Sequence, residues 1–120
     1  MILLDTDHLS VLTDRRAAGH AALVRRLELA QEPLAIPIVA VEEQCKGWLA
    51  KLNRTRDIHQ QIAPYRRLAD LFDFLAEWDI ISLSESAADL FAQFRRQKLR
   101  VGSLDLKIAA ITLAENTLLL

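Results

Sequence analysis

The chain has 120 residues, of which 52% are hydrophobic, and a formal net charge of −1. This length predicts one domain over residues 1–120, and the hydrophobic content excludes a disordered chain. The near-neutral charge excludes a bulk polycation made for nucleic acid, although carboxylates committed to a metal would leave the remaining surface nearer neutral or slightly basic. No apolar run approaches the roughly 20 residues of a membrane span, so we expect no membrane contact.

The N-terminal sequence and the cysteine content both indicate a cytoplasmic protein. MILLDTDHLS has no basic n-region and no small-residue cleavage site, so export is not expected. The single cysteine, Cys45, cannot form an internal disulfide, which fits a reducing compartment.

Four short apolar segments without alternation are predicted strands. They lie at residues 2–4, 34–39, 80–83 and 117–120. Strands that are apolar on both faces indicate a parallel sheet covered on both sides.

Helical patterns fill the intervals between these segments, two in each interval. The clearest are 18–30, 57–77, a helix capped by Ser84 and a helix over Leu104–Glu115 capped by Ser103. The order β-α-α-β-α-α-β-α-α-β predicts the fold class α/β, a three-layer α/β/α sandwich around a central parallel sheet of about four strands.

Asp5 follows the first apolar segment directly. Ligands of open parallel sheets bind beyond the carboxyl ends of the strands, which makes Asp5 a candidate site residue. The alternative is that Asp5, Thr6 or Asp7 only caps the helix that begins near His8. The sequence leaves both interpretations open.

Glu43 lies in the second candidate segment, VAVEEQCKGW at 39–48. On a helix, a narrow stripe of small residues (Ala40, Gly47, Ala50) contains Glu43, which predicts that Glu43 points into a crowded seam, whereas Glu42 reaches solvent. A buried carboxylate is costly unless it is paired or binds a metal. Glu43 is therefore either a site residue or the partner of an Arg or Lys on another helix.

Asp105 stands in the first turn of SLDLKIAAITLAE, which is apolar almost all round and is predicted to be a buried helix. An acid near a helix N-terminus is favourable by only about 0.3–1 kcal/mol. That effect explains the acid but not its place on the helix expected to be central, so we favour a site residue.

Three stretches together resemble the PIN-domain family, and its VapC-type toxins in particular. They are LLDTDHLSVL (3–12), VAVEEQCKGW (39–48) and GSLDLKIAAITLAENTLLL (102–120), and they occur in the family's order. The resemblance implies that Asp5, Glu43 and Asp105 are the metal-binding and catalytic acids, with Thr6 as a supporting hydroxyl. It also implies a further strand and a tail with a fourth acid, which the sequence up to Leu120 does not contain, so the number of metals stays open.

The resemblance implies a metal-dependent endoribonuclease toxin that is neutralised by a cognate antitoxin and forms a homodimer. Three carboxylates without His or Cys favour Mg²⁺ or Mn²⁺ over zinc. Such an ion would activate water for attack on an RNA phosphodiester. Lys98 and Arg100, in the loop before Asp105, are expected to reach the RNA backbone.

Two alternative functions remain at the level of sequence. One is a PIN-like module that binds RNA or protein and has lost catalysis, because the fourth acid is absent. The other is a haloacid-dehalogenase-like phosphatase, because LLDTDHL resembles its strand followed by Asp-x-Asp. In that enzyme Asp5 would be the covalent nucleophile and Asp7 the general acid.

Overall fold

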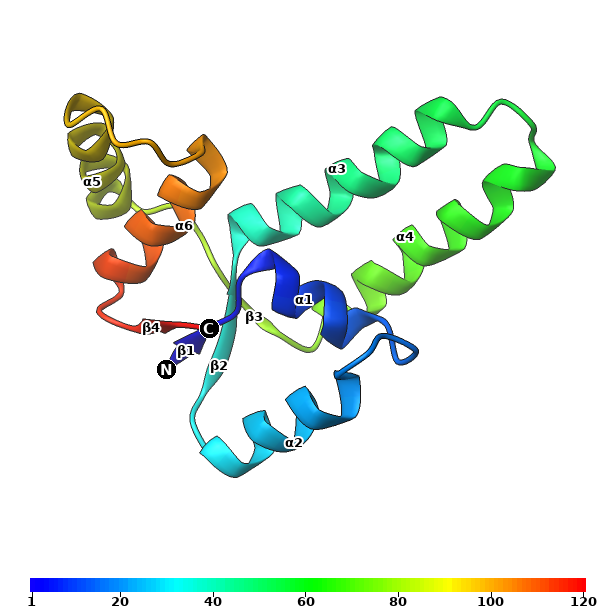
Figure 1. Cartoon of the computed structure of the whole chain (residues 1–120), viewed down its shortest axis with the longest axis horizontal. Helices are drawn as coiled ribbons and strands as arrows, with labels where there is room; N and C mark the ends of the chain where they lie inside the picture. The colour runs from blue at the N-terminus through cyan, green and yellow to red at the C-terminus, as the bar shows by residue number, and fades with distance from the viewer.

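Four short strands and six α-helices alternate in the order expected from the sequence (Figure 1). The computed structural model describes all residues, 1–120. The elements are β1 (Ile2–Leu3), α1 (Thr6–Thr13), α2 (His20–Ala30), β2 (Leu34–Pro37), α3 (Ile38–Arg54), a 3₁₀ turn η1 (His59–Gln61), α4 (Ile62–Leu75), β3 (Asp79–Ile81), α5 (Glu85–Arg96), α6 (Ser103–Ala114) and β4 (Leu118–Leu119).

All strands pair in parallel, in the order β3-β2-β1-β4. The register at the centre pairs Leu3 with Ala35, and β4 joins the other side of β1 by pairing Leu3 with Leu119. The prediction of a central parallel sheet of four strands is confirmed.

Successive residues of the central strands point to opposite faces of the sheet, and both faces are buried. Leu3 and Ala35 pack on one face against α5 and α6, through Ala87, Ile108 and Ile111. The residues that follow them, Leu4 and Ile36, pack on the other face against the helices α1, α2, α3 and α4. Helices therefore cover both faces, which confirms the predicted three-layer sandwich (Figure 1).

The two predicted caps have different outcomes. Ser84 caps α5 as expected, since its hydroxyl accepts a hydrogen bond from the Ala87 N–H at 3.1 Å. The prediction for Ser103 is wrong: Gly102 occupies the cap of α6 and Ser103 is already helical. The helix therefore begins one residue earlier than the preference for a Ser cap suggested.

The hairpin of α3 and α4 projects beyond the sheet (Figure 1). Only the first turns of α3 lie over the sheet, where Val39, Ala40 and Val41 are buried, while the distal part packs on α4. No helix has both the length and the apolar character needed to cross a membrane.

We expect Leu3→Ala to lower the free energy of unfolding by about 2–5 kcal/mol, because it removes a fully buried side chain from the centre of the sheet. Urea unfolding measures the change. Leu29→Ala is the matched control, since Leu29 is 72% exposed, and should stay within about 0.5 kcal/mol of wild type. Equal losses in both variants would contradict the assigned core.

Candidate active site

The chain topology brings the three candidate acids to one edge of the sheet. Asp5 follows β1 and is the cap of α1, and Glu43 lies in the second turn of α3, which begins directly after β2. Helix α6 leads into the parallel strand β4 and so runs antiparallel to it, which puts Asp105, in its first turn, at the same edge. This is the edge where ligands of parallel sheets bind.

Asp5 is held in place by the start of its own helix. Its Oδ1 accepts the backbone N–H of His8 at 3.0 Å and lies 2.8 Å from His8 Nδ1. The Asp5 N–H donates to the Leu120 carbonyl at 3.0 Å, beside the end of β4. The capping alternative is therefore correct for Asp5. Capping the helix leaves Asp5 able to bind a metal ion as well, because a carboxylate accepts up to four hydrogen bonds. Only Oδ1 of Asp5 is engaged here.

Thr6 joins α1 to α3 at the next position. Its hydroxyl donates to Glu43 Oε2, and its backbone carbonyl accepts from the side-chain amide of Gln44 at 3.4 Å. Glu43 is half-buried and has no Lys or Arg partner, so the alternative of an interhelical ion pair is wrong. A half-buried carboxylate held by one hydroxyl keeps an oxygen free for a further ligand.

Glu42 lies outside this arrangement, as expected. It is exposed, and its Oε2 lies 3.0 Å from Lys46 Nζ one turn along α3. The hydrogen bond and the charge of Lys46 hold the pKa of Glu42 below its usual value, and Lys107 on α6 lowers that pKa further through space. Helices α3 and α6 contact each other, which brings Lys107 within electrostatic range of Glu42.

Asp105 sits at the solvent-facing end of the most deeply buried helix. Five residues of α6 are buried, which confirms the predicted central helix, but Asp105 itself is exposed and has no ion-pair partner. A Cβ added to Gly102 would lie 3.9 Å from Asp105 Oδ2, so the carboxylate folds back over the start of its helix.

The three acids lie at the same edge of the sheet, but their side chains do not converge on one point. No group of three carboxylate, imidazole or thiol side chains lies close enough to hold a metal ion. The structure brings Glu43 together with Thr6, and Asp5 together with His8, while Asp105 makes no ion pair with any residue. The donor chemistry still fits Mg²⁺ or Mn²⁺, because the candidate ligands are hard carboxylate oxygens at the ligand-binding edge of the sheet.

The seam predicted around Glu43 is crowded only at its beginning. Ala40 is fully buried, but Gly47 and Ala50 are exposed, and a Cβ on Gly47 would meet nothing within 4 Å. The prediction of a crowded seam beyond Glu43 is therefore wrong. In its place a polar cleft of about 460 Å³ is lined by Glu43, Gln44 and Gly47.

Lys98 and Arg100 lie in the exposed connection between α5 and α6, close in sequence to Asp105. Lys98 has a left-handed backbone with φ of 53°, which turns the chain after α5. Neither residue lines the cleft that contains Glu43. Contact with RNA stays a prediction for both.

Two polar residues of the site were not selected from the sequence, namely His8 and Gln44. His8 contacts Asp5 because three residues separate them at the start of a helix, a spacing that could have identified it. Gln44 depends on α3 crossing α1, for which the sequence carries no signal. Cys45 shows no nucleophile geometry, and burial raises the pKa of its thiol, which disfavours the reactive thiolate.

No family model matches this chain, and no curated protein matches its sequence. Solved structures do match it in fold. The VapBC2 complex of Rickettsia felis, bound to a DNA fragment from its promoter, aligns with a TM-score of 0.70 and 21% identity over 99% of this chain and 85% of the other. VapC20 of Mycobacterium tuberculosis, described as a sarcin-ricin loop cleaving toxin, aligns with a TM-score of 0.63 and 13% identity over 98% and 85% of the two chains.

A toxin–antitoxin complex from Klebsiella pneumoniae aligns similarly, with a TM-score of 0.60 and 22% identity over 99% of this chain and 83% of the other. Alignment over nearly the whole chain shows that the protein has the fold of these toxin structures. The PIN-like, VapC-type fold that the three sequence stretches predicted is thereby confirmed.

We expect Thr6→Val to lower the free energy of unfolding by about 1 kcal/mol, because it leaves the half-buried Glu43 carboxylate without its donor. Thr6→Ser keeps the hydroxyl and should recover most of the loss. Urea unfolding of the three proteins measures both changes. Equal destabilisation by Val and Ser would show that the methyl group, not the hydrogen bond, is what matters.

Proposed function

We propose that this protein is a VapC-type toxin, a metal-dependent endoribonuclease neutralised by a cognate antitoxin. The observation that carries the proposal is the position of Asp5, Glu43 and Asp105 at the carboxyl edge of a sheet with the fold of known toxins. The likeness to VapC20, a toxin that cleaves the sarcin-ricin loop, supports RNA as the substrate class. The compared structures are VapBC2, the VapC20 toxin and a toxin–antitoxin complex, and none of them supports the phosphatase alternative.

Asp5, Glu43 and Asp105 would hold Mg²⁺ or Mn²⁺, which would acidify a bound water and neutralise charge on the phosphate. The protein's own part is orientation. The His8 N–H and ring fix one oxygen of Asp5, and Thr6 fixes one oxygen of Glu43. Second contacts of this kind orient metal-binding side chains, and their loss costs about 10- to 100-fold in metal affinity or activity.

Two apolar surfaces support the proposed protein partners. One is a cleft of about 370 Å³ between α1, α2 and α4, which is lined by Leu12, Val24, Leu27, Leu34, Phe74 and Trp78. The other is the α3–α4 hairpin, where Ile58, Ile62, Tyr65 and Phe72 are each more than half exposed. We assign the cleft to the antitoxin and the hairpin to a second copy of the chain, since surfaces of this kind mark protein contacts.

A binding module without catalysis is the second candidate, and the separation of the three acids favours it. Such a protein would bind RNA or a partner and show no cleavage that depends on metal. The same assay distinguishes the two functions.

We expect the protein to cleave a mixed RNA pool in Mg²⁺ or Mn²⁺ and to be inactive in EDTA. Glu43→Gln should reduce cleavage at least about 100-fold, because it removes a charged ligand. Glu42→Gln is the matched control, since it changes the neighbouring acid, which is exposed and paired with Lys46, and should keep full activity. Gel analysis of labelled RNA measures both. Intact RNA with every metal would favour the module without catalysis.

We expect Mn²⁺ to raise the melting temperature of the wild type, because an ion bound only by the folded state stabilises it. Asp105→Asn should abolish most of this shift, while its melting temperature in EDTA should stay within a few degrees of wild type, since Asp105 is exposed and unpaired. Thermal unfolding with and without Mn²⁺ measures both. An unchanged Mn²⁺ shift in the variant would remove Asp105 from the metal site.

A further inference from the structure

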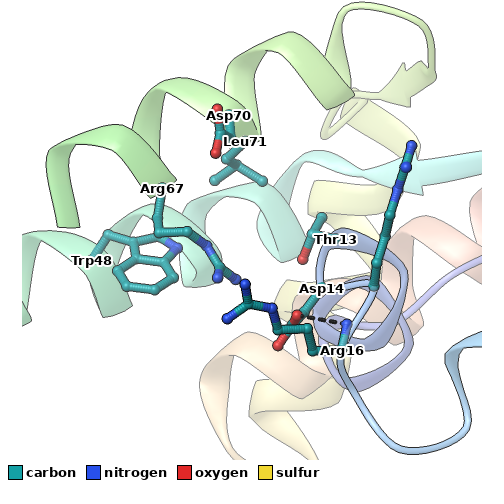
Figure 2. Close-up of a pocket in the computed structure, with 8 residues that line it drawn as sticks. Thr13, Asp14, Arg16, Trp48, Arg67, Asp70 and Leu71 are labelled. Carbon is teal, nitrogen blue, oxygen red and sulfur yellow. Dashed lines mark hydrogen bonds between the residues drawn. The ribbon is translucent and has the colours of Figure 1, made fainter. Parts of the chain in front are cut away.

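Two adjoining clefts form one continuous surface that begins at Glu43 and leads away from the sheet. The cleft beside Glu43 shares Thr13, Asp14, Trp48 and Arg67 with a second cleft of about 290 Å³ (Figure 2). One wall is α3, and the other is the end of α1 with the segment after it, while α4 closes the far end. We refer to the two clefts together as the basic groove.

The basic groove has an excess of positive charge on a protein whose net charge is −1. Five cations line it, namely Arg15, Arg16, Lys51, Arg54 and Arg67, against the three carboxylates of Asp14, Glu43 and Asp70. None of these cations takes part in the ion pairs of the structure, which join Met1 to Glu32, His8 to Asp5 and Lys46 to Glu42. The cations of the groove are therefore free to bind an anion.

The positions of the cations indicate a ligand between them. Arg16 lies in the turn after α1 and Arg67 lies on α4, and their side chains point toward one another across the pocket (Figure 2). Like charges directed into one space repel each other unless an anion lies between them. The Arg67 side chain is also held in position before any ligand binds, because its guanidinium lies 5.4 Å from the ring centre of Trp48. The Nζ of Lys51 lies 5.6 Å from the centre of the same ring.

We propose that the basic groove binds the phosphodiester backbone of single-stranded RNA and leads it to Glu43. The part of this inference that concerns Glu43 rests on the proposed function. Helix α3 rises 1.5 Å per residue, which puts about 16 Å between Glu43 and Arg54, a length that spans several phosphates at about 3.4 Å per stacked nucleotide. Arg16, Arg67, Lys51 and Arg54 would contact phosphates without reading the sequence of bases.

The lining favours RNA over a segment of protein. Trp48 and Leu71 are the only hydrophobic residues of the basic groove, whereas the cleft between α1, α2 and α4 is mainly apolar. A positively charged groove with an aromatic ring is typical of surfaces that bind single strands. An acidic protein segment is the competing occupant, and the experiment includes it.

The test measures binding of a fluorescein-labelled 12-nucleotide RNA of mixed sequence by anisotropy, in EDTA so that metal-dependent cleavage does not intervene. We expect Arg67→Gln and Arg16→Gln each to weaken binding about five- to tenfold for every sequence. Each should also reduce the slope of log K against log salt by about 0.7. Arg66→Gln is the matched control, because Arg66 is the exposed neighbour on α4 and does not line the groove, and should stay within about twofold of wild type.

Arg67→Lys keeps the charge and should retain most of the affinity, which separates loss of charge from misfolding. Equal affinities of Arg67→Gln, Arg66→Gln and wild type would overturn the proposal, and so would tight binding of a 12-residue polyglutamate peptide in place of RNA. Cleavage in Mg²⁺ is scored separately. Cleavage by the wild type without any effect of Arg67 would refute the groove alone, whereas binding that depends on Arg67 without cleavage would refute the proposed function alone.

Discussion

The parallel pairing of β1 with β2 is the constraint on which the rest of the molecule depends. Its register aligns Leu3 with Ala35, and the residues that follow, Leu4 and Ile36, then face the opposite side. Because side chains alternate along a strand, a slip of one residue would exchange the two faces and direct each set of side chains at the wrong layer of helices. The layers of the sandwich are thus specified by two short segments of buried residues.

The same pairing of β1 with β2 also positions the residues of the candidate site. Since β1 and β2 are parallel and adjacent, the helices that follow them begin side by side, and Thr6 at the start of α1 reaches Glu43 on α3. Beyond this contact α3 leaves the sheet, and the surface opens beside Gly47 into the basic groove. One feature, the projecting α3, therefore forms both a wall of the candidate site and the route proposed for its substrate.

Much of the fold could be predicted from the sequence, because strands of a sheet that is covered on both faces are short apolar segments without alternation. The sheet order was not predictable, since β1, β2 and β4 have similar apolar compositions. The site was partly predictable. Asp5, Glu43 and Asp105 reach one edge by topology alone, but the direction of the Asp105 side chain depends on a rotamer that no pattern encodes. The groove was missed because small residues such as Gly47 have the same sequence pattern whether a neighbour covers them or not.

The strand β4 has a consequence for the order of folding. It pairs with β1, from the opposite end of the chain, and the Leu120 carbonyl beside it accepts the Asp5 N–H at the edge where the three acids lie. Closing so large a loop carries the greatest entropic cost of any pairing in the sheet, so this strand is expected to join last. During synthesis the other three strands can assemble first, and the backbone around Asp5 reaches its final form only once β4 has paired with β1.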